Sequence, residues 1–275
     1  IKIIIFIFHV LQGISQLSES KQKDRFYYDT EFLSSPEGRS IRILSEYYGP
    51  KRKLKKHKIE NTIVFFGSAR ISPKSEHESN SKNGEQKKLN ISQYYLDAQS
   101  LSKKLTKWSM KIKDPKKRHI ICSGGGPGIM EAANRGAAEA DGQSIGLTIS
   151  LPYEVTKNEF ISEDLNLKFH YFFMRKFWFL YSAKAFVVWP GGFGTLDELM
   201  ELLTLIQTRK IKKRLPIVLY GKDYWKNVIN WNYLVDIGTI SKEDLKLFYI
   251  SDEINDSYTF ITSFLEKQEL EGPNF

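Results

Sequence analysis

Two segments of the chain share one order of features: a short apolar run, a glycine-rich loop and an amphipathic helical pattern. The first reads "HIICSGGGPGIMEAANRGAAEADG" (119–142) and the second "KAFVVWPGGFGTLDELMELL" (184–203). An apolar run that passes through a glycine loop into a helix is typical of the strand–turn–helix units of α/β proteins. No other feature of the sequence limits the fold as strongly.

The rest of the chain continues this alternation. Further strands are predicted within 61–70, where an apolar run ends in Gly-Ser, and at 143–152 and 215–221. Helices are predicted at 91–110, 170–183 and 223–238, with short helices after them. Alternating strands and helices form βαβ units, and right-handed crossovers place the carboxyl ends of all the strands at one edge. We therefore predict a Rossmann-like, doubly wound parallel sheet flanked by helices.

This catalytic domain is expected to span residues 61–275, after an N-terminal extension over 1–60 that is helical and partly irregular. Within the extension, Ile41, Leu44 and Tyr47 or Tyr48 have helical spacing, and Gly-Pro at 49–50 predicts the end of that helix.

Two segments lack a clear place in this fold. The polar stretch at 72–90 has no periodicity and is interpreted as a surface loop inserted into the domain. The apolar run at 1–11 is too short to span a bilayer. We interpret it as an extra strand or an artefact of gene prediction rather than the core of a signal peptide.

Composition excludes several classes of protein. The chain of 275 residues has a net charge of +9, and much of the excess lies in basic runs at 51–58 and 103–118. These runs show no repeated alternation of aromatic and basic residues and no named motif, so we interpret them as solvated faces and expect neither nucleic-acid nor membrane binding. Cys122 is the only cysteine, which favours a reducing, cytoplasmic location. The histidines do not have metal-binding spacing, and no cofactor is indicated.

The two glycine loops, 123–128 and 190–195, are expected at the same edge of the sheet. The start of a helix offers unpaired N–H groups and a partial positive charge, and glycine allows an anion to approach the backbone. The first loop is not the dinucleotide fingerprint, because Ile129 occupies the third glycine position. Neither loop is followed by the Lys-Ser/Thr of a P-loop. With "FGSAR" (66–70), the two loops still predict a site for a phosphate or ribose.

Three acids follow the second loop. Asp197 is interpreted as a complement to the helix dipole. Glu198 has two possible roles, as a catalytic carboxylate or as the acid of a capping box with Thr195. The role of Glu201 stays open.

A cationic pair, Arg175 and Lys176, lies among aromatic residues in the preceding predicted helix. Such a pair needs an anionic partner or a route to solvent. Because this helix starts at the same sheet edge, we expect Arg175 and Glu198 to face one pocket from consecutive βα units.

These motifs together resemble a known family. "GSAR", "SGGGPGIMEAANRGA", the Arg-Lys pair and "PGGFGTLDE" are similar to the Lonely Guy family of cytokinin riboside 5′-monophosphate phosphoribohydrolases, formerly labelled lysine decarboxylases. The match runs from about residue 41 to 260, and "IRILSEYYGP" and "LPYEVTKNEFISEDLNLKFHYFFMRK" resemble its longer bacterial-type branch. The resemblance implies hydrolysis of a nucleoside 5′-monophosphate to free base and ribose 5-phosphate. It also implies a homodimer with the site near the subunit interface, and no metal or cofactor.

The resemblance also implies roles for individual residues. Arg175 and Glu198 take the catalytic positions. The substrate-binding positions are Gly67, Ser68, Arg70, Gly125, Gly126, Gly128, Met130, Lys176, Gly191, Gly192, Gly194 and Thr195. Phe172 and Val155 depart from the family pattern, and they put the preferred base in question more than the reaction.

Three functions compete on the sequence alone. The first is hydrolysis of AMP or of a cytokinin nucleotide. The second is a non-catalytic nucleotide-binding, sensor or carrier module of the same fold, such as the related molybdenum-cofactor carriers. The Arg175 and Glu198 pair favours the enzyme. An amino-acid decarboxylase is rejected, because the sequence around its lysines does not indicate a pyridoxal site.

Overall fold

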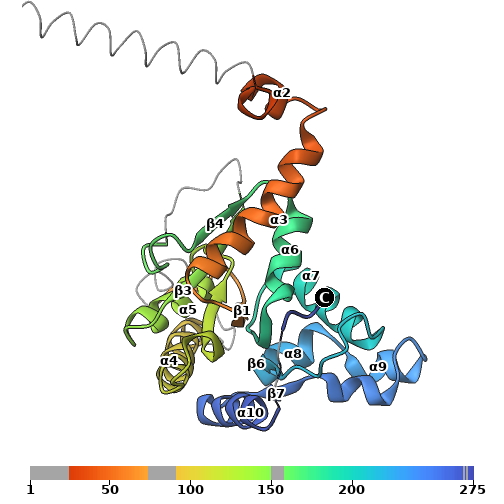
Figure 1. Ribbon diagram of the computed structural model, residues 1–275. Helices are drawn as coiled ribbons and strands as arrows, with labels where there is room; N and C mark the ends of the chain where they lie inside the picture. Colours follow the sequence, from red (N-terminus) through yellow and green to blue (C-terminus); the bar gives the residue numbers. More distant parts are fainter. Residues whose placement is uncertain (1–24, 74–90, 150–157, 269, 271) are drawn as a thin grey trace, which may run out of the picture. The chain divides into compact units, whose positions relative to one another are not determined.

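The structure is a computed structural model that describes residues 25–73, 91–149, 158–268, 270 and 272–275 (Figure 1). The chain divides into a unit that ends at Gly49 and a larger unit from Pro50 to Phe275. The apolar run at 1–11, most of the loop at 72–90, and Val155 lie outside the described residues.

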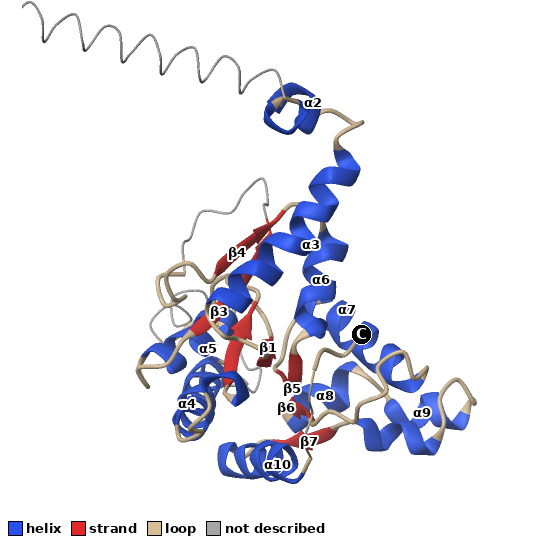
Figure 2. Cartoon of the chain, viewed as in Figure 1, coloured by secondary structure: helices blue, strands red, loops and turns tan. Residues whose placement is uncertain are grey.

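The larger unit contains a parallel sheet of seven strands in the order β4-β3-β2-β1-β5-β6-β7 (Figure 2). The strands are β1 (Asn61–Phe66), β2 (His119–Ser123), β3 (Ser144–Ile149), β4 (Asn166–Phe169), β5 (Ala183–Val188), β6 (Ile217–Tyr220) and β7 (Tyr249–Ser251). The chain moves outward from β1 to β4 and then returns to the other side of β1, so the order reverses between β1 and β5. This arrangement confirms the predicted Rossmann-like fold.

Helices cover both faces of this sheet. They are α4 (Ser92–Met110), α5 (Ile129–Ala138), α6 (Phe172–Tyr181), α7 (Phe193–Gln207), α8 (Lys222–Val228), α9 (Trp231–Asp236) and α10 (Ile254–Lys267), with 3₁₀ turns η4 (Pro115–Lys117) and η5 (Lys242–Leu247). Helices α4, α5 and α10 lie on one face, and α6 and α7 lie on the other (Figure 2). None of the described helices is long and apolar enough to cross a membrane.

The alternating side chains of β1 build the two layers of the core. Ile63 and Phe65 are fully buried in the cluster beneath α4 and α5. Phe66 points to the other face, where its ring packs edge-on against Phe179 of α6, with 5.0 Å between the centroids. Burial on both faces explains why the strand is apolar throughout.

The smaller unit contains η1 (Phe26–Tyr28), α2 (Thr30–Ser34) and most of α3 (Arg39–Lys56). The predicted end of the helix at Gly49-Pro50 is wrong, because α3 continues to Lys56. Proline removes one helical hydrogen bond. Pro50 and Leu54 are nevertheless buried in the larger unit, and this burial stabilises the last turns.

Other boundaries differ from the prediction for local reasons. The helix expected over 223–238 is two helices, because the side chain of Asn230 accepts a hydrogen bond from the Tyr233 N–H (3.1 Å) and starts α9 anew. The short strands β4 and β7 were not predicted. The region after 238 also contains α10, which has 14 residues and is not a short helix.

The backbone of Ser68 joins three loops at the carboxyl edge of the sheet. Its N–H donates to the Pro190 carbonyl (3.1 Å), and its carbonyl accepts from the Ile129 N–H (3.0 Å). Gly128 allows this close approach. Its φ is +70°, and a Cβ there would lie 2.4 Å from the Ser68 carbonyl oxygen. The loops after β1, β2 and β5 therefore form one connected surface.

We expect Gly128→Ala to lower the free energy of unfolding by about 2–4 kcal/mol, because it adds a backbone clash to the strain of a positive φ. Chemical denaturation measures this change. Gly238→Ala is the matched control: φ is +75° there, but a Cβ would meet nothing within 4 Å. If Gly128→Ala lowers the free energy of unfolding no more than Gly238→Ala does, the close approach of Gly128 to Ser68 does not contribute to stability.

Candidate functional site

A cavity of about 700 Å³ lies where the sheet order reverses, at the carboxyl ends of β1, β2, β5 and β6. Ligands of open α/β sheets bind at this position. Most of the predicted site residues line it, namely Arg175, Glu198, Gly67, Ser68, Arg70, Met130, Gly191, Gly192, Gly194 and Thr195. The structure thus brings the three predicted loops and the cationic helix together around one pocket.

Four of the predicted residues do not line this cavity: Gly125, Gly126, Gly128 and Lys176. In the first loop, Gly124 lines it instead. Gly125 has a φ of +72°, and a Cβ there would lie 2.4 Å from the Thr148 side chain. Such a glycine forms the turn rather than the wall of the pocket.

The second loop presents the start of α7 to the pocket. Gly192 is the N-cap and α7 begins at Phe193, so the first bond within the helix joins the Leu196 N–H to the Gly192 carbonyl (3.0 Å). The N–H groups of residues 193–195 precede that bond and are the ones that an anion at a helix start would meet. The loop is compact, because a Cβ on Gly191 would lie 2.1 Å from the Thr195 Oγ1.

This geometry excludes the capping box. Thr195 lies inside the helix rather than at its N-cap, and Gly192 has no capping side chain. Glu198 is therefore not the capping acid. Asp197 also lies beyond the first turn, so its interpretation as a complement to the helix dipole is wrong.

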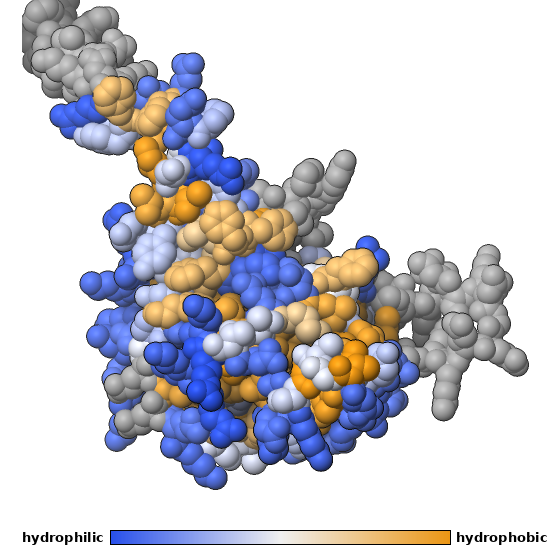
Figure 3. Space-filling view, turned by 90° about the vertical axis from the view of Figure 1, so that its right-hand side faces the viewer, coloured by the Kyte–Doolittle hydropathy of each residue, from blue (hydrophilic) through white to orange (hydrophobic). Residues whose placement is uncertain are grey.

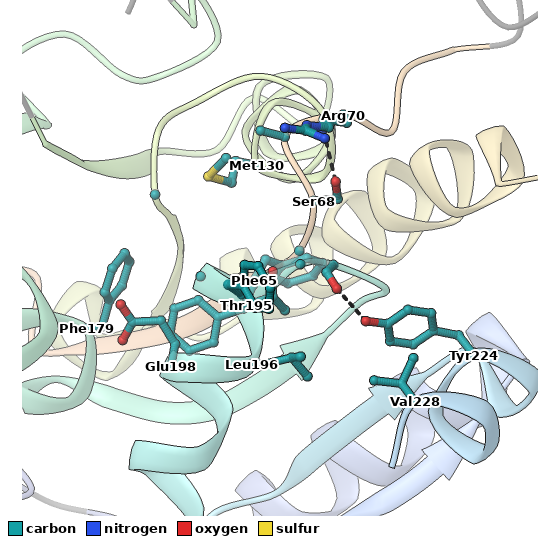
Figure 4. A pocket seen from close by; sticks show the side chains of 18 of the residues that line it. Phe65, Ser68, Arg70, Met130, Phe179, Thr195, Leu196, Glu198, Tyr224 and Val228 are labelled. Carbon is teal, nitrogen blue, oxygen red and sulfur yellow. Dashed lines mark hydrogen bonds between the residues drawn. The ribbon is translucent and has the colours of Figure 1, made fainter. Parts of the chain in front are cut away.

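Glu198 is a buried carboxylate that faces two cations. Its side chain is 8% exposed, with Oε1 3.9 Å from Arg175 Nη2 and Oε2 3.9 Å from Lys176 Nζ. The Arg175 guanidinium also lies over the rings of Phe172 (4.9 Å) and Phe179 (5.6 Å). Figure 4 shows the Phe179 ring beside the Glu198 carboxylate at one end of the pocket.

Lys176 makes closer contacts with the other two acids. Its Nζ lies 2.8 Å from Asp197 Oδ2 and 2.8 Å from Glu201 Oε2. These contacts turn Lys176 toward α7 and explain why it does not line the pocket. They also resolve the role of Glu201, which the sequence left open. The two ion pairs connect α6 to α7.

Burial raises the pKa of Glu198 to about 7, and the negative charges of Glu201 and Asp197 add to this effect. The positive charges of Lys176 and Arg175 act in the opposite direction. Burial acts to lower the pKa of Lys176, but its hydrogen bonds to Asp197 and Glu201 leave that pKa above its ordinary value. Near neutral pH the pocket thus holds a carboxyl group that can take up or release a proton.

Sequence reasoning missed several residues of the pocket, including Phe179, Phe193, Tyr224 and Val228. Phe193 is 94% exposed at the start of α7. Tyr224 and Val228 belong to α8, which follows the next strand along the sheet. Because they follow a predicted strand, the sequence could have placed them at the same edge of the sheet. It gave no indication that they contact the second loop.

The fold and the pocket define a Rossmann-like α/β protein with a binding site at the reversal of its strand order. Residues 130–260 match the model of the family described as "Possible lysine decarboxylase". The matched segment contains Arg175, the second glycine loop and Glu198, and the match confirms the resemblance seen in the motifs.

Several proteins are similar to this chain. The pyrimidine/purine nucleotide 5′-monophosphate nucleosidase of Escherichia coli K12 is 30% identical over 115 residues, which cover 37% of this chain and 24% of the nucleosidase. This chain thus matches about a quarter of that relative's length. The X-ray structure of TM1055 has 19% identity and a TM-score of 0.47, and covers 76% of this chain and 99% of its own. The Moco carrier protein of Chlamydomonas reinhardtii has 16% identity and a TM-score of 0.43, with coverage of 76% and 99%.

The raised pKa of Glu198 predicts a pH-dependent stability. A carboxyl group whose pKa is raised by folding contributes stability below its unfolded pKa, and this contribution is lost as the pH rises through the folded pKa. We expect wild type to lose up to about 3 kcal/mol of unfolding free energy relative to Glu198→Gln between pH 5 and pH 8. Denaturant titrations across this range measure the difference.

Glu163→Gln, on the exposed surface, is the control for removing one carboxylate. A difference between wild type and Glu198→Gln that stays constant with pH would contradict the assignment.

Proposed function

We propose that this chain hydrolyses the N-glycosidic bond of nucleoside 5′-monophosphates, AMP or a cytokinin riboside monophosphate, to free base and ribose 5-phosphate. The observation that carries the proposal is the buried Glu198 carboxylate opposite Arg175, in the same pocket as the open start of α7. The E. coli relative, described as a nucleotide 5′-monophosphate nucleosidase, supports the reaction class.

The chemistry needs a carboxylate at the sugar. As the bond between the base nitrogen and C1′ breaks, positive charge develops on the ribose, as in other glycoside hydrolyses. Ionised Glu198 stabilises that charge and takes a proton from the attacking water, whose oxygen bonds to C1′. The base leaves with the bonding electron pair and is protonated by solvent, and Glu198 releases the proton it took from water back to solvent. Arg175 stabilises the negative charge that develops on the base, or fixes the substrate beside Glu198.

The other end of the pocket suits the phosphate. The N–H groups at the start of α7 and the glycines of 191–194 allow an anion to approach the backbone. Exposed Arg70 supplies a positive charge on the pocket wall. The 5′-phosphate and the C1′ bond to the base would then lie on opposite sides of the ribose, which places the ribose between α7's start and Glu198.

A panel of nucleoside monophosphates, followed by chromatography of base and ribose 5-phosphate, tests the reaction. We expect AMP to release adenine, with a rate that rises with pH through an apparent pKa near 7. We expect Glu198→Gln to reduce turnover about 10³-fold or more while AMP binding persists, because it removes the carboxylate but keeps the shape of the side chain.

Glu163→Gln should retain full activity. Tight binding of AMP without base release from any nucleotide of the panel would favour the sensor or carrier function instead.

We also propose that the chain forms a homodimer through the surface beside this pocket. Large apolar side chains are exposed there on α6 and at the start of α7: Phe172 (51%), Phe173 (50%) and Phe193 (94%). Figure 3 shows hydrophobic patches among hydrophilic residues on the side of the molecule that faces right in Figure 1. Exposed apolar patches of this kind favour protein–protein contact.

Light scattering at micromolar concentration is expected to give the mass of a dimer, and Phe173→Asp is expected to shift it toward monomer because a charge would be buried at the contact. Leu96→Asp, on α4 on the other face of the sheet, is a comparable change away from the pocket, because Leu96 is 41% exposed. A wild-type monomer at these concentrations would exclude a site built at the subunit interface.

A further inference from the structure

Tyr224 of α8 contacts the second glycine loop in a way that the reaction chemistry does not require. Its hydroxyl donates a hydrogen bond to the carbonyl oxygen of Gly191 (Figure 4). The donor is half-buried on the pocket wall, and the acceptor lies one residue before the N-cap of α7.

The accepting peptide joins two glycines, Gly191 and Gly192. Neither has a Cβ, so the plane of this peptide can turn over at little conformational cost. In a trans peptide, the carbonyl and the following N–H point in opposite directions. With the carbonyl held by Tyr224, the Gly192 N–H points away from Tyr224. A turned peptide would instead expose a carbonyl oxygen, which repels an anion.

The helix that carries Tyr224 is firmly placed. Trp225 is fully buried and its Nε1–H donates to the Tyr220 carbonyl (3.0 Å). The Lys222 N–H donates to Asp252 Oδ1 (2.6 Å), and the Gly221 N–H donates to the Ser251 carbonyl (2.9 Å). These bonds connect α8 to β6 and to the residues at the end of β7, so the hydroxyl approaches the loop from a rigid support.

We propose that Tyr224 is a positioning residue that selects one orientation of the Gly191–Gly192 peptide and so prepares the loop for the phosphate group of the substrate. This inference rests on the proposed function, because it assigns the 5′-phosphate to the second glycine loop. It predicts that the Tyr224 hydroxyl affects recognition of the phosphate but not of the nucleoside, and binding more than chemistry.

Tyr224→Phe tests the proposal, because it keeps the ring and removes only the hydroxyl. We expect the KM and the calorimetric Kd for AMP to rise about 10-fold, the value of one hydrogen bond of about 1.4 kcal/mol, with kcat within about twofold. The Kd for ribose 5-phosphate should rise similarly, whereas binding of adenosine should be unchanged. Tyr233→Phe, on exposed α9, is the matched control and should leave all values unchanged.

A second variant tests the peptide orientation itself. Gly192 has a φ of −94°, and a Cβ there would meet nothing within 4 Å. Alanine is therefore tolerated in the observed orientation but not in the turned one, where φ would become positive. We therefore compare the AMP affinity of Gly192→Ala with that of the double variant that also carries Tyr224→Phe. The loss of affinity between these two proteins should be smaller than the loss between wild type and Tyr224→Phe.

Each outcome decides the proposal. The proposal is overturned if Tyr224→Phe leaves AMP binding unchanged, or if it lowers the affinities for AMP and for adenosine equally. It is also overturned if Tyr224→Phe lowers the affinity for AMP equally with and without the Gly192→Ala change. If wild type cleaves AMP while any of these results holds, only the role of Tyr224 fails. If wild type neither binds nor cleaves any nucleotide, the proposed function fails as well. Thermal unfolding confirms that each variant is folded before its binding is measured.

Discussion

The two hydrogen bonds of the Ser68 backbone connect the loops that form the pocket. They join the end of β1 to Pro190 after β5 and to Ile129 at the start of α5. These loops can meet because the strand order reverses beside β1, which places β2 and β5 on its two sides. Without Gly128 at the contact, the loop after β2 could not approach Ser68 so closely. The part of the pocket wall that these three loops form depends on this junction.

A second constraint is electrostatic. Helices α6 and α7 bring two cations and three acids together. The acids differ in how closely a cation approaches them and in how deeply they are buried. Lys176 is matched by Asp197 and Glu201 at 2.8 Å, whereas Glu198 is buried at 3.9 Å from either cation. Burial therefore outweighs attraction at Glu198, and its pKa rises to about 7. The structural ion pairs hold the helices, and the less well matched carboxylate is the one suited to proton transfer.

Most of the fold could be predicted from hydrophobic periodicity, and most of the pocket from glycine loops at one sheet edge. The errors have local causes. Helix α3 passes through Pro50 because tertiary burial outweighs one missing hydrogen bond. The short strands β4 and β7 have too few residues for a clear pattern. Gly125 and Gly128 were assigned to the substrate because sequence does not separate a glycine that forms a turn from one that lines a cavity.

The sequence by itself determined the parallel sheet, the edge at which its loops gather, and the two glycine loops that start helices. It did so because residue periodicity and glycine act over a few neighbouring positions. Only the tertiary structure decided how deeply Glu198 is buried beside Arg175, which acids pair with Lys176, and that Tyr224 contacts Gly191. Those relations join separate elements of the chain, and their distances depend on how the elements pack.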